Sequence, residues 1–569
     1  MTDPIAAAEA AIAADRACAD PAIWITRLAD ATIRARAAAL AAEGPRGRPL
    51  WGVPVAVKDN IDIAGLPTTA ACPDFATVAG AHAPAVARLL AAGANIIGKT
   101  NLDQFATGLV GVRSPYGVPR NRFDPDRVPG GSSSGSAVAV AAGIVPLALG
   151  TDTAGSGRVP AMFGNIVGLK PTVGAIPSLG VVPACRSIDT ISIFATHVDL
   201  ALAAARAIAG PEAADRYSRR PPFDHLRRGG EGLRVAVIDP RPICTGPVAE
   251  VYDRVVAGLA DVERIDIAPF LAIARLLYDG PWVAERTAAL AGFLDAHPDS
   301  ILPTTRAILE GGRARGAVEA FDGFHALAEA RRLADQLFAR CDALLLPTAP
   351  GTPSLAELAA DPIGPNSWLG SYTNFVNLCD LAGWAVPAGM DGQGLPAGVC
   401  LLGPAWSEGR LAGLADRIHR AHATRIGATD QALPPPAPPA PLGGDEIALF
   451  CIGAHMEGLP LNRAITGRGG RLLRVAATVA EYRLFDLGNR PGLLHAPGQG
   501  GAIEGEVWAL PAAAIGPVLA EVPPPLGFGT VRLQDGPCLG FLAEPSGLAE
   551  AAEITALGGW RALLKRRAG

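Results

Sequence analysis

Two segments rich in serine and glycine contain the residues best suited to nucleophilic chemistry in this sequence. Residues 129–136 are PGGSSSGS and residues 151–158 are TDTAGSGR, with an uncharged apolar run between them. Taken alone, the first segment is compatible with a flexible linker, a phosphate-binding loop or a reactive loop. A linker rarely runs directly into a buried strand, so a reactive loop is favoured. Small residues before Ser156 would let backbone N–H groups converge on a substrate oxygen, as an oxyanion hole requires.

Lysine is rare in this chain, and its positions raise a chemical question. Of the 49 basic residues only four are lysines, at positions 58, 99, 170 and 565, and arginine supplies the rest. Codon composition alone explains the rarity. It does not explain why lysine is kept where it is, because a buried lysine can lose its proton whereas arginine stays charged.

Residues 93–100, GANIIGKT, match the phosphate-binding pattern GxxxxGK[ST]. That chemistry needs a strand, then the loop, then a helix whose N-terminus faces the phosphate. Here a helical pattern precedes the motif, and Asn95–Ile97 are predicted to form the strand itself. We therefore interpret the match as coincidental and assign no nucleotide to it.

The elements that would position these segments alternate between strands and helices. The first 43 residues favour two helices, 83–92 one helix, 136–143 another, and 247–340 several long ones. Apolar runs at 53–61, 94–98, 144–150, 233–240 and 341–348 indicate buried strands. Together they predict an α/β fold with a mixed central β-sheet covered by helices on both faces.

The Pro-rich segment QALPPPAPPAPLGGD, residues 431–445, predicts an extended linker between two domains. The domain before it would span 1–430, and the one after it 446–569. The second domain is predicted to be small and mainly β, with a closing helix at about 546–566.

Composition excludes several functional classes. A chain of 569 residues with 49% hydrophobic and 18% charged residues is globular rather than disordered. A net charge of -5 argues against a nucleic-acid binder. Nine scattered cysteines without a CxxC pair predict neither a disulfide framework nor a metal site, and they fit a reducing cytoplasm. The acidic N-terminus is unlike a signal peptide, and no membrane segment or cofactor is expected.

Four ordered motifs resemble the amidase signature family: VAVKDN (55–60), GKTNLDQFATG (98–108), GGSSSGS (130–136) and DTAGSGRVPA (152–161). The likeness covers about 1–425. It implies that Ser156 is the nucleophile, Ser132 the serine after a cis peptide bond, and Lys58 the base. A serine hydroxyl needs such a base, and only a neutral lysine can serve. The backbone N–H groups of Thr153, Ala154 and Gly155 would form the oxyanion hole.

Two further segments resemble allophanate hydrolases. In LLYDGPWVAER (276–286) Tyr278 and Arg286 would contact a substrate carboxylate, about two helical turns apart, with Arg158 as weaker support. In the tail, FCIGAHMEGLPLN (450–462) is similar to their C-terminal domain, which resembles the γ-glutamylcyclotransferase-like fold. That domain is associated with decarboxylation of N-carboxycarbamate, and His455 is the candidate residue there.

The resemblance implies that the chain hydrolyses allophanate and releases ammonia. It also implies a homodimer and a functional link to a biotin-dependent urea carboxylase. The alternatives are a general small-molecule amidase, a transamidase-like subunit that makes Gln-tRNA, or a non-catalytic scaffold. Activity on biuret or malonamate, and the roles of Lys99 and Lys170, stay open at this point.

Overall fold

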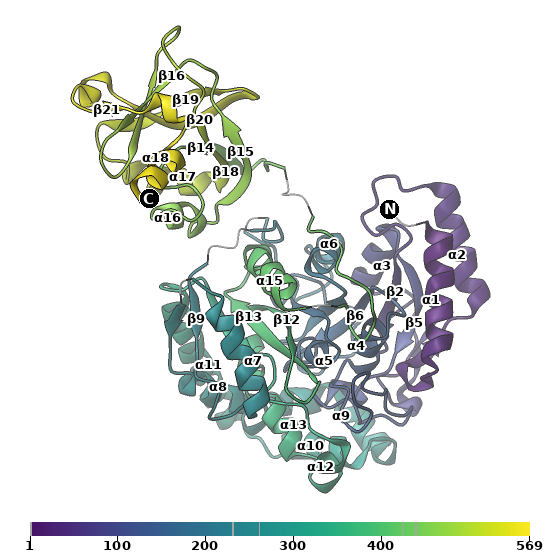
Figure 1. The fold of residues 1–569 in the computed structure, drawn as a ribbon. Helices are drawn as coiled ribbons and strands as arrows, with labels where there is room; N and C mark the ends of the chain where they lie inside the picture. The colour runs from purple at the N-terminus through teal and green to yellow at the C-terminus, as the bar shows by residue number, and fades with distance from the viewer. Residues whose placement is uncertain are drawn as a thin grey trace. The chain divides into compact units, whose positions relative to one another are not determined.

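The computed structural model describes residues 3–222, 224–229, 233–260, 262–423, 425–437 and 441–568. The chain divides into two compact units (Figure 1). The first comprises Met1–Leu226 and Arg234–Pro436, and the second comprises Arg227–Leu233 and Ala437–Gly569. Separate clusters of buried apolar side chains lie within the two units, so each has a hydrophobic core of its own.

An 11-stranded mixed sheet forms the centre of the first unit. In spatial order its strands are β1 (Trp24–Arg27), β5 (Asn95–Thr100), β2 (Pro54–Lys58), β6 (Leu147–Asp152), β8 (Thr190–Ala195), β7 (Val167–Lys170), β12 (Ala382–Met390), β13 (Pro396–Gly403), β11 (Ala343–Pro347), β9 (Val235–Val237) and β10 (Val262–Arg264). Strands β5, β2 and β6 run parallel to one another, and β8, β7, β12, β13 and β11 each run antiparallel to the strand before them. A small hairpin pairs β3 (Pro67–Thr68) with β4 (Thr77–Val78).

Some helices of this unit pack on the sheet, and others pack on neighbouring helices (Figure 1). They are α1 (Pro4–Cys18), α2 (Asp30–Glu43), α3 (Pro84–Ala91), α4 (Ser134–Ala141), α5 (Val159–Phe163), α6 (Val198–Ile208), α7 (Gly246–Ala257), α8 (Ala268–Asp279), α9 (Trp282–Ala296), α10 (Pro303–Gly312), α11 (Ala317–Phe338), α12 (Leu355–Ala360), α13 (Gly364–Leu369), α14 (Asn374–Leu378) and α15 (Glu408–His422). The predicted α/β fold with a mixed, helix-covered sheet is confirmed.

Local sequence explains the elements that position the serine-rich segments. Strand β2 is PVAVK and is buried along its whole length, as expected for a strand covered on both faces. Helix α4 contains only Ser, Gly, Ala and Val, and all eight of its residues are buried. Such small side chains let a helix pack closely against β2 and β6. The helix begins at Ser134, so the serine-rich loop leads directly into it.

Two boundaries differ from the sequence prediction. The motif GANIIGKT lies largely within β5, which continues through Lys99 to Thr100, and no helix follows it directly. The closing helix predicted at 546–566 is wrong over most of its length, because only α18 (Trp560–Ala568) is a regular α-helix there. Gly558 has φ 71°, a left-handed conformation that ends the preceding turn and prevents one continuous helix.

The second unit is mainly β. A five-stranded sheet contains β15 (Arg471–Ala477), β18 (Glu504–Pro511), β14 (Glu446–Cys451), β20 (Gly536–Ala543) and β19 (Leu526–Leu533) in that order. A three-stranded sheet contains β17 (Pro491–His495), β16 (Tyr482–Asp486) and β21 (Ala552–Glu553). Helices α16 (Asn462–Thr466), α17 (Ala512–Ala520) and α18 complete the unit. Within the described parts of the whole chain, no helix is both long and apolar enough to cross a bilayer.

Candidate active site

Lys58 is the last residue of β2, and its side chain is 0% exposed. Its Nζ donates to the hydroxyl Oγ of Ser132 at 2.9 Å and to Oγ1 of Thr151 at 2.7 Å. Burial lowers the pKa of Lys58 to about 7, against the opposing field of nearby aspartates. A large share of the amine is therefore neutral near pH 7, and the neutral amine can accept a proton from Ser132.

The loop carrying Ser132 is held on both sides. The peptide bond between Gly131 and Ser132 is cis, as the family resemblance implies. The carbonyl of Ser132 accepts from the N–H of Asp103 at 3.0 Å. A Cβ at position 131 would lie 2.2 Å from Oδ2 of Asp103, so only glycine fits there. Next in sequence, Ser133 donates to the carbonyl of Thr151 at 3.1 Å.

Ser156 lies in a tight turn that follows β6. The buried carboxylate of Asp152 accepts the N–H of Gly155 and the N–H of Gly157, both at 3.0 Å, on either side of the serine. Arg158 donates to the same carboxylate through Nε and Nη2, both at 2.9 Å. Burial acts to raise the pKa of Asp152, but the adjacent Arg158 outweighs it and the pKa is lowered. Asp152 therefore stays ionised and organises the turn.

The hydroxyls of Ser132 and Ser156 are not hydrogen-bonded to each other in this structure. The contact between Lys58 and Ser132 is formed, whereas the contact between Ser132 and Ser156 is a prediction. Both serines are buried. Lys58 links Ser132 to Thr151 in β6, and Asp152 at the end of β6 binds the N–H of Gly155, next to Ser156.

The predicted oxyanion donors are not equivalent. The N–H of Gly155 already donates to Asp152, so this part of the prediction does not fit the structure. The N–H groups of Thr153, Ala154 and Ser156 have no acceptor among the described residues. The sequence did not predict the Ser156 N–H as an oxyanion donor. The direction of an N–H group in a turn depends on the distant residues that hold the turn in place.

Only glycine fits at position 155, because of its backbone conformation and the side chain next to it. Its φ is 123°, and a Cβ there would lie 2.4 Å from Oγ1 of Thr373. That hydroxyl donates to the carbonyl of Ala154 at 2.6 Å. The amide of Asn377, in α14, donates to the carbonyl of Asp152 at 2.8 Å. The segment around α14 therefore holds the turn from its outer side.

Arg158 has a different environment from the one expected of a substrate ligand. It is 0% exposed, and besides Asp152 its Nη2 donates to the carbonyl of Thr373 at 3.1 Å and to Oδ1 of Asn377 at 3.2 Å. The guanidinium is thus engaged by the turn and α14. Nη1 of Arg158 has no hydrogen-bond partner among the described residues, and the expectation that Arg158 helps to hold a substrate anion stays a prediction.

Tyr278 and Arg286 come from two helices, and the prediction of one continuous helix is wrong. Tyr278 is in the last turn of α8 and Arg286 in the second turn of α9, with Gly280 and Pro281 between the helices. Proline at this point ends one helix and begins the next. The break nevertheless brings the two side chains together, and the guanidinium carbon lies 5.5 Å from the tyrosine ring centroid.

Arg286 is a buried cation without a counter-ion. It is 1% exposed, and its Nη1 donates to Oγ1 of Thr107 at 2.7 Å and to the carbonyl of Ala106 at 3.3 Å. Its Nη2 meets only the thiol sulfur of Cys185 at 4.0 Å. No carboxylate of a described residue forms an ion pair with it. A guanidinium whose donors are not all engaged by a carboxylate is suited to bind an anionic group.

The other two buried lysines, Lys99 and Lys170, contact residues outside the proposed relay. Lys99 forms an ion pair with Asp59 at 3.1 Å, and its Nζ donates to Thr68 Oγ1 at 2.7 Å. Lys170 donates to the carbonyl of Pro171 at 2.7 Å, and burial lowers its pKa to about 8 against the field of Asp152. Neither lysine has a hydrogen bond to Ser132 or Ser156.

Thr151, Asp152 and Asp189 were not selected from sequence. Thr151 and Asp152 could have been found, since they immediately precede the turn that contains Ser156. Asp189 had no local signal, because it approaches the turn from the next strand of the sheet. Its carboxylate accepts the hydroxyl of Thr153.

His455 lies in the loop after β14 in the second unit. Its ring stacks on Phe541, with 5.0 Å between centroids and 10° between planes. Burial lowers the pKa of His455 and so favours the neutral imidazole. No described titratable side chain hydrogen-bonds its ring. Its catalytic role stays a prediction.

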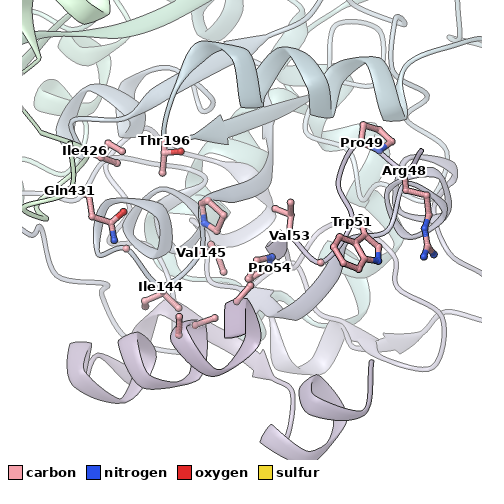
Figure 2. A pocket seen from close by; sticks show the side chains of 16 residues that line it. Arg48, Pro49, Trp51, Val53, Pro54, Ile144, Val145, Thr196, Ile426 and Gln431 are labelled. Atoms are coloured by element: carbon pink, nitrogen blue, oxygen red, sulfur yellow. The ribbon is translucent and has the colours of Figure 1, made fainter. Parts of the chain in front are cut away.

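A cavity of about 490 Å³ lies away from these residues. It is lined at the starts of β2 and β6 by apolar side chains such as Trp51, Pro54 and Val145 (Figure 2). The relay residues stand at the opposite ends of the same strands. In the described residues, no group of three or more His, Cys, Asp or Glu side chains is placed to hold a metal ion.

Comparison with known proteins places the two units in recognised families. The Amidase family model matches residues 11–412, and the model of the allophanate hydrolase C-terminal domain matches 447–565. Urea amidolyase from Saccharomyces cerevisiae is 42% identical over 560 residues, covering 91% of this chain. The chain spans only about 30% of that relative's length.

Solved structures agree with the sequence matches. The structure of Kluyveromyces lactis allophanate hydrolase is similar with a TM-score of 0.85 and 37% identity, covering 100% of this chain and 97% of that one. A glutamyl-tRNA(Gln) amidotransferase subunit from Symbiobacterium thermophilum is 36% identical in sequence, but the match covers only 67% of this chain and 86% of that protein.

Proposed function

Because this chain belongs to the amidase family and carries an allophanate hydrolase C-terminal domain, we propose that it hydrolyses allophanate. The observation that carries the proposal is Arg286, a buried guanidinium that forms no ion pair with a carboxylate of the described residues, in a site that also holds a lysine with a pKa of about 7. Allophanate is a linear amide bearing a carboxylate, which supplies the missing anion. Its carboxylate would bind Arg286 and Tyr278 while its terminal amide faces Ser156.

The proposed reaction begins with proton transfer. Neutral Lys58 takes a proton from Ser132, which takes one from Ser156, and the Ser156 oxygen attacks the carbon of the terminal amide. The oxyanion is stabilised by the open N–H groups of Thr153, Ala154 and Ser156. The relay then returns a proton to the leaving nitrogen, and ammonia departs from the acyl-enzyme.

Water completes the turnover. The same relay removes a proton from water, which attacks the acyl carbon and releases Ser156. The products of this stage are ammonia and N-carboxycarbamate. We propose that the latter loses carbon dioxide with the help of the second unit and His455. No cofactor is required by these steps. Arg158 is proposed as a positioning residue for the turn.

Purified protein incubated with allophanate tests the proposal, with ammonia as the readout. Malonamate, biuret and an uncharged short amide form the comparison panel. Efficient ammonia release from allophanate and loss of release in Ser156→Ala are expected. Rapid hydrolysis of uncharged amides without turnover of allophanate would instead favour a general amidase. Activity that needs tRNA and ATP would favour the transamidase reading.

The organisation of the relatives suggests the biological setting. The matched yeast protein is a longer chain named urea amidolyase, of which this chain covers about 30%. We propose that a biotin-dependent urea carboxylase activity supplies allophanate to this enzyme in the cytoplasm. The homodimer implied by the family resemblance is proposed as its assembly, and light scattering of the purified protein would test it.

A further inference from the structure

Asp189 stands where the catalytic turn leaves the sheet. It directly precedes β8, whose first residue, Thr190, pairs with Asp152 at the end of β6. Asp189 is therefore beside Thr153, the next residue along the turn. It is 7% exposed, and nothing in the proposed reaction uses it.

The Asp189 carboxylate joins two parts of the site. Its Oδ1 accepts the hydroxyl of Thr153, which belongs to the oxyanion turn. Its Oδ2 accepts the N–H of Ala184 at 2.8 Å, and both oxygens receive the N–H of Cys185, at 3.0 and 3.1 Å. The N–H of Asp189 in turn donates to the carbonyl of Cys185 at 2.9 Å. Residues 184–189 thus close into a small loop around this carboxylate.

The same loop reaches the substrate-binding arginine. The thiol of Cys185 donates to the carbonyl of Trp282, at the start of α9, at 3.3 Å. Its sulfur is the group that Nη2 of Arg286 faces at 4.0 Å. One short loop therefore links the oxyanion turn, through Asp189, to α9 and its guanidinium.

The hydrogen bonds that Asp189 accepts from other groups leave Arg286 available to bind a substrate carboxylate. A carboxylate and a guanidinium buried in one site normally form a direct ion pair. Here the carboxylate oxygens are already occupied by donors from Thr153, Ala184 and Cys185, and no ion pair with Arg286 is formed. Asp189 contributes negative charge to the site without occupying the arginine's donors.

We propose that Asp189 is a positioning residue that sets the distance between the oxyanion turn and Arg286, and thereby the selectivity for amides bearing a carboxylate. The inference rests on the proposed function and deepens it. A substrate held by its carboxylate at Arg286 reacts only if the distance from Arg286 to Ser156 lets its amide carbon reach the Ser156 hydroxyl. A displacement of about 1 Å between such groups can lower the rate about 100-fold.

Asp189→Asn in the full-length chain tests the proposal, with kcat/KM measured for allophanate and for an uncharged amide. The ratio of the allophanate value to the uncharged-amide value is expected to fall about tenfold or more. The reason is that the oxyanion turn is no longer held at a fixed distance from Arg286. Thr153→Val removes only the link between Asp189 and the turn, and it should also lower the ratio, because the turn is then no longer held at a fixed distance from Arg286. Cys185→Ala removes the sulfur contacts to Arg286 and to the carbonyl of Trp282, and it should lower the ratio.

A pH profile with the uncharged amide adds a readout that a purely structural role would not change. The charged groups that act on Lys58 are Asp103, Asp189, Asp152 and Arg286. Burial raises the pKa of Asp189 to about 6, so this carboxylate is mostly ionised at the pH where Lys58 titrates. Removing the negative charge at 189 removes a field that raises the pKa of Lys58, so the acid limb should move to lower pH. Thr153→Val should leave that limb in place.

Asp215→Asn is the matched control. Asp215 also caps a loop, accepting the N–H of Ser178 at 2.6 Å and of Leu179 at 3.1 Å, but it is not among the charges acting on Lys58. Asp189→Asn with an unchanged ratio and an unmoved acid limb overturns the proposal, as does an equal effect of Asp215→Asn. A wild-type enzyme without preference for the carboxylate overturns the proposed function instead, and the acid-limb shift still tests the charge of Asp189.

Discussion

At the scale of single residues, burial converts ordinary side chains into reactive ones. Lys58 has a pKa of about 7 because it is removed from water, and the aspartates around it only partly restore the charged form. We expect kcat/KM for amide hydrolysis to rise with pH up to about 7 and then level off, since the base must be neutral. Below this pKa, activity should fall about tenfold per pH unit.

The pH–rate profile of the wild type, compared with Lys58→Arg, checks this expectation. Arginine keeps the positive charge and much of the bulk, but it cannot give up its proton near neutral pH. Lys58→Arg should therefore lose at least about 1,000-fold in kcat, within the range for removing a catalytic base. Retention of the acid limb in this variant would show that another group is titrating.

Arg286 carries the second prediction at this scale. Arg286→Gln should lower kcat/KM for allophanate by about 10- to 150-fold, the range expected for losing charge-assisted hydrogen bonds. Hydrolysis of an uncharged amide should change by less than about threefold. Arg275→Gln, on the exposed face of α8, is the control and should affect neither substrate. Equal losses on both substrates would contradict the anion-binding role.

At the scale of elements, the turn between β6 and α5 is built around residues that accept no side chain. Gly155→Ala would force a Cβ against Thr373 and require a left-handed φ of 123° from alanine. We expect a loss of about 100-fold or more in kcat and about 1–3 kcal/mol of unfolding free energy. Gly292→Ala, in α9 with open space around it, should instead be neutral or stabilising by about 0.5–1 kcal/mol.

Steady-state kinetics and thermal unfolding of these two glycine variants separate the effects. A fully active Gly155→Ala would mean that the turn can relax away from Thr373. In that case the geometry of the oxyanion hole would depend less on α14 than the contacts indicate.

At the scale of the whole molecule, the chain consists of two units with separate cores, so we expect the two proposed chemical steps to be altered independently. His455→Asn should leave ammonia release from allophanate within about twofold of wild type while carbon dioxide release lags behind it. His495→Asn, an exposed histidine paired with Glu481, is the control. Parallel assays of ammonia and carbon dioxide show whether His455 acts in decarboxylation. Equal rates of both gases in His455→Asn would argue against a decarboxylating role for this residue.

The sequence by itself determined which groups are available for chemistry. Lys58, Ser132 and Ser156 were found because their motifs occur in a fixed order, and the small residues around them predicted tight turns. The alternation of apolar strands with helices predicted the mixed sheet, since the period of hydrophobic residues is a local property. These signals depend only on residues close together in the chain.

The tertiary structure decided what those groups can do. Arg286 donates to Ala106 and Thr107, about 180 residues earlier, and no carboxylate of a described residue forms an ion pair with it. Arg158 donates instead to Asp152 and to Asn377 in α14. Asp189 meets Thr153 only because β8 pairs with β6. Charge state, hydrogen-bond occupancy and the direction of a turn's N–H groups depend on contacts between distant segments, and no local pattern in the sequence encodes them.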